Sequence, residues 1–158
     1  MPERILVVDD EVDLATSCTR LLESRGYVTG IASSAEEALE SLNSLDYQLV
    51  LTDLKMPGMG GMELLRHVRE KSQEMPVIMM TAYSTVEDAV EAMRLGAADF
   101  VPKPFTPDHL VIVVEKALEK HSLRRENQSL RDQLSQEFSF DNIIGKSAAM
   151  AQIFESIK

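Results

Sequence analysis

Residues 49–61 have the sequence LVLTDLKMPGMGG, and this stretch decides the fold. Its first four residues, Leu49–Thr52, form a short run without charge that ends abruptly at Asp53. Such a run is typical of a strand buried on both faces of a sheet. The proline and glycines of residues 57–61 indicate a loop, and the apolar spacing over Met62–Lys71 predicts a helix. The stretch therefore predicts a strand, a loop and a helix, with an aspartate where the strand ends.

The same unit recurs along the whole chain. Five strands alternating with five helices predict an α/β fold, a doubly wound parallel sheet with helices on both faces. The predicted strands are Ile5–Val8, Tyr27–Ile31, Leu49–Thr52, Val77–Met80 and Phe100–Val101, and the predicted helices are Val12–Arg25, a segment capped by Ser34, Met62–Lys71, Thr85–Leu95 and a last helix from Asp108. In the fourth helix, the spacing of Val86, Ala89, Val90 and Met93 predicts that these four side chains face the core.

Composition limits the possible functions. A chain of 158 residues suffices for one ordinary domain with an appendage. No apolar run is long enough to span a membrane, no signal peptide is evident, and the single cysteine favours a cytoplasmic protein. The net charge of -10 opposes nonspecific nucleic-acid binding. Residues 1–121 hold 11 Lys/Arg and 21 Asp/Glu, whereas residues 122–158 hold five of each, which predicts a boundary near His121.

Charged and hydroxyl side chains lie at the carboxyl ends of four predicted strands. These residues are Asp9 and Asp10, Asp53, Thr81 and Lys103. In open parallel sheets this edge is where ligands bind. Clustered carboxylates need a compensating cation, and carboxylate oxygens suit Mg2+. With an ammonium and a hydroxyl available for further anionic oxygens, the set fits an aspartate that accepts a phosphoryl group.

These residues belong to longer motifs in a family's order and spacing. The motifs are Val7–Glu11, Leu51–Gly61, Met80–Ala82 and Asp99–Phe105. On these motifs, residues 1 to about 120 resemble the receiver domain of two-component response regulators. The resemblance implies a flavodoxin-like sheet of order 2-1-3-4-5 and a phosphoryl group received from a sensor histidine kinase at Asp53. It implies Mg2+ bound by Asp10, Asp53 and the backbone carbonyl of Lys55, with Asp9 acting through a metal-bound water.

The resemblance also implies a conformational switch. Thr81 and Lys103 would respond to the phosphoryl group, and Phe100 would turn inward as Thr81 moves. Phe100 has no hydroxyl group, so this signal would be carried by packing. The affected surface would comprise the fourth helix, the fifth strand and the start of the last helix. The Lys103-Pro104 peptide bond is expected to be cis, which is tolerable before proline.

A heptad pattern follows the receiver-like segment. Leu123, Asn127, Leu130 and Leu134 are spaced 4, 3 and 4 residues apart, as in the a and d positions of a coiled coil. Leu110, Val113, Val114, Ala117 and Leu118 extend an apolar face upstream. We therefore expect residues 121–137 to form a helical linker and the last helix and linker to form a parallel homodimer. The alternative is a helix folded onto its own domain.

The end of the chain predicts a further domain. Residues 138–147 are expected to break the helix, and Ser147 to cap an amphipathic segment with Met150, Ile153, Phe154 and Ile157 on one side. Phe140–Ser147 resembles the opening of the AAA+ domain of NtrC-like, sigma-54-dependent transcription activators. Residues 138–158 are accordingly assigned to the start of that domain, which the receiver would regulate. The chain holds no phosphate-binding Gly-x-x-x-x-Gly-Lys-Ser/Thr loop and no basic recognition helix, so neither ATP hydrolysis nor direct DNA binding is predicted.

Two other functions remain as alternatives. A haloacid-dehalogenase-type phosphohydrolase also uses Mg2+ and an aspartate after a strand, but usually has a second aspartate two residues later as acid/base. Position 55 is a lysine, which counts against this enzyme. A pseudo-receiver that serves only for dimerisation is the other alternative, and failure to bind Mg2+ would support it.

Overall fold

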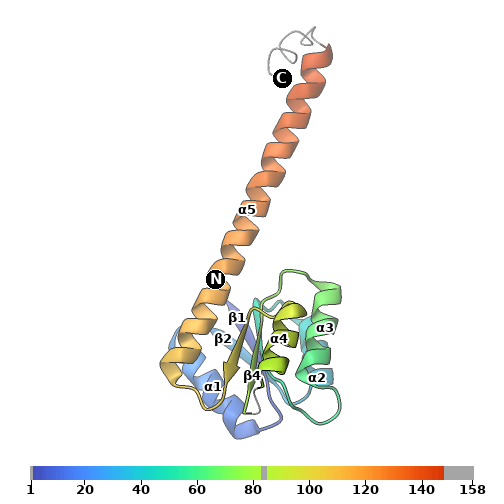
Figure 1. The fold of residues 1–158 in the computed structure, drawn as a ribbon. Helices are drawn as coiled ribbons and strands as arrows, with labels where there is room; N and C mark the ends of the chain where they lie inside the picture. The colour runs from blue at the N-terminus through green and yellow to red at the C-terminus, as the bar shows by residue number, and fades with distance from the viewer. Residues whose placement is uncertain (1, 83–84, 148–158) are drawn as a thin grey trace. The chain divides into compact units, whose positions relative to one another are not determined.

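The computed structural model describes residues 2–82 and 85–147, with side chains described as far as residue 135. Strands and helices alternate throughout (Figure 1). The strands are β1 (Arg4–Val8), β2 (Val28–Ala32), β3 (Leu49–Asp53), β4 (Val77–Thr81) and β5 (Asp99–Pro102). The helices are α1 (Val12–Ser24), α2 (Ala35–Ser44), α3 (Gly61–Lys71), α4 (Val86–Arg94) and α5 (Pro107–Ser147).

The five strands form one parallel sheet of order β2-β1-β3-β4-β5, which confirms the predicted fold class and strand order. In register, Val8 lies beside Thr52 and Thr81 lies beside Pro102. All strands run the same way, so their carboxyl ends meet at one edge. The residues that follow β1, β3, β4 and β5 are therefore neighbours in space.

Two apolar layers enclose the sheet. Leu6 and Val8 of β1 belong to the layer under α2, α3 and α4, whereas Ile5 and Val7 belong to the layer under α1 and the start of α5 (Figure 1). Successive strand side chains point to opposite faces, so a strand covered on both sides needs consecutive apolar residues. β3 and β4 are buried along their full length. This burial explains why their sequences show apolar runs rather than alternation.

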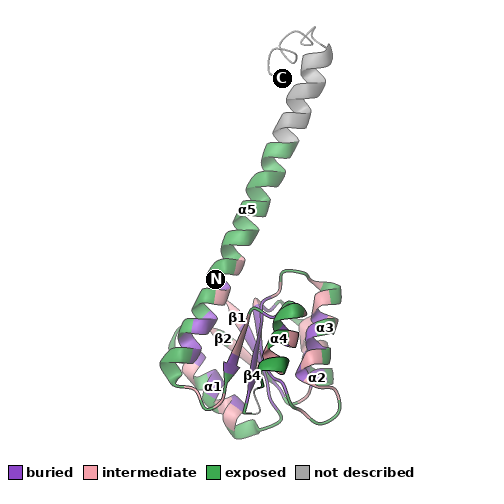
Figure 2. Cartoon of the chain, in the orientation of Figure 1, coloured by how far each residue is buried: buried purple, intermediate pink, exposed green. Residues whose placement is uncertain are grey.

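The prediction of which α4 side chains face the core is wrong. Val86, Val90 and Met93 are 81%, 61% and 50% exposed, whereas Ala92 is fully buried (Figure 2). Ala89, which was predicted to face the core with them, is half-buried. The helix turns small alanines toward the sheet, so the larger apolar residues lie on its outer side. Hydrophobicity alone predicted the opposite face because both sides of this short helix carry apolar residues.

The predicted helix break at residues 138–147 is also wrong, because α5 continues without interruption to Ser147. From Asp108 onward no glycine or proline occurs before Gly145, so nothing in the backbone opposes a helix there. The predicted amphipathic segment with Met150 lies outside the described residues. The chain divides into two compact units, residues 1–121 and 122–158.

The upstream apolar face of α5 is used within the first unit. Leu110, Val113, Val114 and Leu118 are buried in the layer shared with α1, so they do not extend an exposed dimerisation face. Leu123, Leu130 and Leu134 are exposed. None of the described helices combines the length and apolar composition needed to cross a bilayer.

Candidate functional site

Backbone hydrogen bonds hold the candidate site residues at the carboxyl edge of the sheet. The Asp9 N–H donates to the Ala32 carbonyl at 3.1 Å, just beyond the paired ends of β1 and β2. The Lys103 N–H donates to the Thr81 carbonyl at 2.8 Å, which fixes the chain after β5 beside the end of β4. Asp53 is the last residue of β3. The backbone thus brings Asp9, Asp53, Thr81 and Lys103 together before any side-chain contact is considered.

An ammonium group bridges two buried carboxylates. Lys103 Nζ donates to Asp9 Oδ2 at 3.1 Å and to Asp53 Oδ2 at 3.3 Å. The Lys103 side chain is 11% exposed, Asp9 is fully buried and Asp53 is nearly so. The other oxygens are also engaged, because Asp9 Oδ1 accepts from the Glu11 N–H at 2.9 Å and Asp53 Oδ1 accepts from the Lys55 N–H at 3.4 Å. The bridge connects strands that are far apart in the sequence.

Three carboxylates form a possible metal site. One oxygen each from Asp9, Asp10 and Asp53 lies within 4.8 Å of the others. Asp10 is exposed, so the cluster opens to solvent on its side. Three negative charges against the single Lys103 ammonium leave an excess that a divalent cation can neutralise. An all-oxygen donor set open to water fits Mg2+, which binds few carboxylates and keeps several waters.

Burial and charge shift the titration of the bridging pair. Burial raises the pKa of Asp53, and the neighbouring Asp9 charge adds to this effect, while Lys103 opposes both. Burial by itself lowers the pKa of Lys103, but its hydrogen bonds and attraction to the two carboxylates outweigh burial, so its pKa is raised. The pKa of Asp53 stays raised although this residue pairs with a cation, because burial, together with the Asp9 charge, outweighs the attraction to Lys103. Lys103 therefore remains an ammonium.

The other predicted site residues occupy the same region. Thr81 is fully buried at the end of β4, and the Lys103-Pro104 bond is cis, as predicted. The Lys55 N–H donates a hydrogen bond to Asp53 Oδ1, while the Lys55 side chain is exposed. Phe100 lies opposite Met79 in the β4–β5 register and packs, half-buried, against the layer under α2–α4. The metal, catalytic and switching roles of these residues stay predictions.

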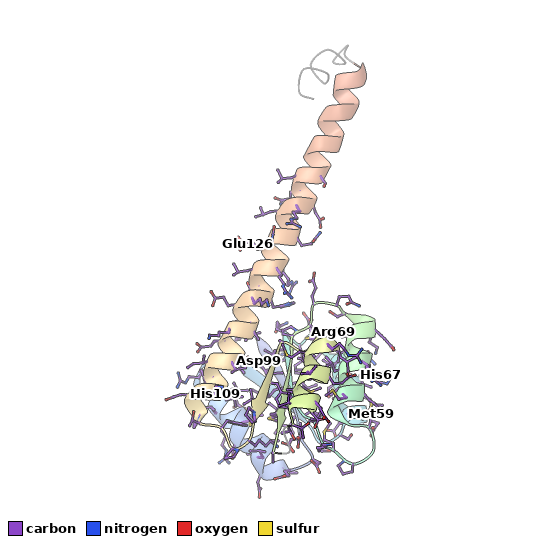
Figure 3. All side chains as sticks on the ribbon, viewed as in Figure 1. Met59, His67, Arg69, Asp99, His109 and Glu126 are labelled. Carbon is purple, nitrogen blue, oxygen red and sulfur yellow. The ribbon has the colours of Figure 1, made fainter. Side chains whose placement is uncertain are left out.

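Sequence reasoning missed the requirement for glycine at position 61. The loop between β3 and α3, on which Figure 3 labels Met59, returns so closely that a Cβ on Gly61 would overlap the Asp53 carbonyl oxygen and lie 2.9 Å from Leu54 Cα. The Gly61 N–H also donates to the Leu54 carbonyl at 3.0 Å. The Gly60-Gly61 pair indicated a turn in the sequence, but only the return of the chain onto Asp53 explains why the second glycine is needed.

Comparison with known proteins defines the class. The family model described as the response regulator receiver domain matches residues 5–115, and the chain belongs to this family. A CheY-like response regulator receiver domain protein from Methanospirillum hungatei JF-1 has the same fold, with a TM-score of 0.76 and 32% sequence identity. The match covers 78% of this chain and 99% of that protein's chain.

Longer relatives match almost the whole chain. It is 38% identical over 150 residues to the regulatory protein AtoC of Escherichia coli K12, covering 95% of this chain and 32% of AtoC. It is 34% identical over 153 residues to the DNA-binding transcriptional regulator NtrC of the same organism, covering 97% of this chain and 32% of NtrC. The predicted resemblance to NtrC-like regulators is thereby confirmed. The chain spans about a third of the length of these curated relatives.

Proposed function

We propose that this chain is a phosphorylation-dependent switch in which Asp53 accepts a phosphoryl group from a sensor histidine kinase. One observation carries the proposal. The Asp53 carboxylate, at the end of a central strand, lies 3.3 Å from the Lys103 ammonium and within 4.8 Å of the Asp9 and Asp10 oxygens. Membership of the receiver family supports this role. The same membership favours it over the haloacid-dehalogenase-type enzyme, as does a lysine at position 55.

The reaction would be a direct displacement at phosphorus. An Asp53 carboxylate oxygen attacks the phosphorus of the kinase phosphohistidine, the P–N bond breaks, and the imidazole nitrogen keeps the electron pair. The products are an aspartyl phosphate and an unphosphorylated histidine. Lys103, already paired with Asp53 Oδ2, transfers its hydrogen bond to a phosphoryl oxygen. The Thr81 hydroxyl binds another phosphoryl oxygen.

Some residues of the site would bind the metal directly, and one would bind it through a water molecule. Asp10, Asp53 and the backbone carbonyl of Lys55 would hold Mg2+ directly. Asp9 would act through a metal-bound water, while its own oxygens accept hydrogen bonds from Lys103 and from the Glu11 N–H. Bound Mg2+ supplies positive charge that stabilises the transferred phosphoryl group.

The output of the switch would be a change in packing. As Thr81 moves toward the phosphoryl group, the half-buried Phe100 ring would turn inward and alter the surface of α4, β5 and the start of α5. The exposed Val86 and Val90 on α4 lie on that surface. We propose that the change is transmitted through a homodimer formed by α5 and the linker of residues 121–137. In a full-length protein it would regulate an AAA+ ATPase, beginning near residue 138, that activates sigma-54 transcription.

The test is intact mass after incubation with a small phosphodonor, with and without Mg2+. The account predicts a gain of one phosphoryl group that requires Mg2+ and is absent from Asp53→Asn. Asp99→Asn is a matched control, because Asp99 lies at the start of β5, and it should gain the group normally. Lack of both phosphorylation and Mg2+ binding by the wild-type chain would instead support a pseudo-receiver.

A further inference from the structure

We propose that the linker pairs with the same segment of a second copy as a parallel, in-register two-stranded coil, and that Glu126 and Arg131 select this arrangement. The inference deepens the proposed function and rests on its homodimer. The pairing segment comprises residues 119–134 of α5.

The first observation is the exposed apolar stripe of this segment. Leu123, Leu130 and Leu134 are 58%, 52% and 65% exposed, and Asn127 between them is exposed as well (Figure 2). The 4-3-4 spacing places Leu123 and Leu130 at d positions and Asn127 and Leu134 at a positions. Association with a second helix removes these leucines from water.

The second observation is the charge beside the stripe. In this heptad, Glu126 occupies a g position and Arg131 the e position of the following heptad, and Figure 3 labels Glu126 on α5. Both side chains are exposed, and within the described part of the chain neither takes part in an ion pair. They are therefore available to a partner. One heptad earlier, Glu119 and Arg124 repeat the same arrangement of signs.

These charges distinguish the two possible directions. In a parallel in-register pair, a g residue lies beside the partner residue five positions later, so Glu126 faces the partner's Arg131, and twofold symmetry makes the contact twice. In an antiparallel pair, g faces g and e faces e. With Leu123 opposite the partner's Leu134, Arg124 would then face the partner's Arg131, whereas Glu126 would lose its attractive contact and face the uncharged Gln133 of the partner subunit. Attraction in the first case and repulsion in the second favour the parallel pair.

Asn127 selects the register. In the parallel in-register pair, Asn127 meets the partner's Asn127, and the two amides can hydrogen-bond to each other. In an antiparallel pair, residues at a positions pack against residues at d positions, so Asn127 meets a leucine. In a parallel pair shifted by one heptad, Asn127 meets a leucine or a lysine of the partner. In either alternative the amide loses its matching partner in the interface. The charges and the asparagine therefore specify the same arrangement, with a second copy of this chain as the occupant.

Charge reversal tests the pairing on the 158-residue chain. Sedimentation equilibrium should show that Glu126→Arg and Arg131→Glu each raise the dimer Kd by about tenfold, because each turns two attractive contacts into repulsive ones. The double variant should return Kd to within about threefold of wild type, as restored pairs require. Arg125→Glu, at the outward f position, is the matched control and should leave Kd unchanged. A monomeric wild-type chain, or single variants without effect, would overturn the proposal.

Cysteine cross-linking tests the direction. A parallel pair brings the two copies of Leu134→Cys together, so mild oxidation should give a covalent dimer, whereas Ser135→Cys on the adjacent outward position should not. In an antiparallel pair centred near Gln128, the two cysteines would lie about 16 Å apart, beyond the reach of a disulfide. Cross-linking between Leu134→Cys and Leu123→Cys chains in preference to like chains would refute the parallel arrangement. Phosphodonor labelling of the same variants keeps failure of this inference distinct from failure of Asp53 as acceptor.

Discussion

Replacing Lys103 with methionine should reveal how strongly the site depends on its ammonium. Lys103 Nζ lies 3.1 Å from Asp9 Oδ2 and 3.3 Å from Asp53 Oδ2, and its side chain is 11% exposed. At an effective dielectric constant of about 20, each contact has a Coulomb energy of roughly 5 kcal/mol, much of it offset by desolvation. Breaking a buried ion pair typically costs about 3–5 kcal/mol. Because the exposed Asp10 side admits water, we expect the lower end, about 3 kcal/mol.

The assay is urea unfolding at neutral pH without divalent ions. Lys116→Met, an exposed lysine on α5, is the control and should change the free energy of unfolding by less than about 0.5 kcal/mol. Mg2+ should reduce the Lys103→Met deficit, because it supplies positive charge to the same carboxylates. The pKa of Lys103 is raised, so its stabilising charge is fully present below its ordinary pKa and disappears as the pH rises through the raised value. A deficit below about 1 kcal/mol, or one unaffected by Mg2+, would refute this reasoning.

Three further predictions concern the same edge of the sheet. Gly61→Ala should destabilise the fold by about 2–3 kcal/mol in urea unfolding, whereas Gly60→Ala, whose Cβ would lie 3.3 Å from Leu54 O, should cost clearly less. Asp53→Asn should stabilise the metal-free protein at neutral pH, because the pKa of Asp53 is raised and ionisation is penalised in the folded state. That gain should vanish as the pH falls through the raised pKa to the ordinary 3.8, and a gain largest in acid would contradict it. Mg2+ at ten times its Kd should add about 1.4 kcal/mol of stability, and Asp10→Asn should abolish this effect in thermal unfolding.

Much of the fold and of the site could be predicted from two features of the sequence, its short apolar runs and the alternation of these runs with helical segments. Consecutive apolar residues, as in Leu49–Leu51, mark strands buried on both faces, and alternation with helices makes the sheet parallel. A parallel sheet then places the residues after its strands at one edge. Asp9 and Lys103 are 94 positions apart, yet this rule predicted them as neighbours, and Lys103 Nζ bonds to Asp9 at 3.1 Å.

The features that could not be predicted depend on packing between elements. α4 buries Ala92 and exposes Val86, so the face that packs on the sheet is not the one that hydrophobicity alone would choose. Gly61 is required by the return of the chain onto the Asp53 carbonyl, a contact that the turn pattern does not show. The end of α5 was misplaced because residues 138–144 permit a helix and only surrounding structure could stop it.

The most direct test of Asp53 as phosphoacceptor is chemical trapping of the phosphorylated residue. Borohydride reduces an aspartyl phosphate to homoserine, and peptide mass spectrometry then locates the change. After reaction with a phosphodonor and Mg2+, the account predicts homoserine at position 53, within the stretch of residues 49–61, and none when Mg2+ is omitted. Homoserine at position 9 or 10 instead, or a phosphoryl group that resists reduction because it lies on another residue type, would contradict the account.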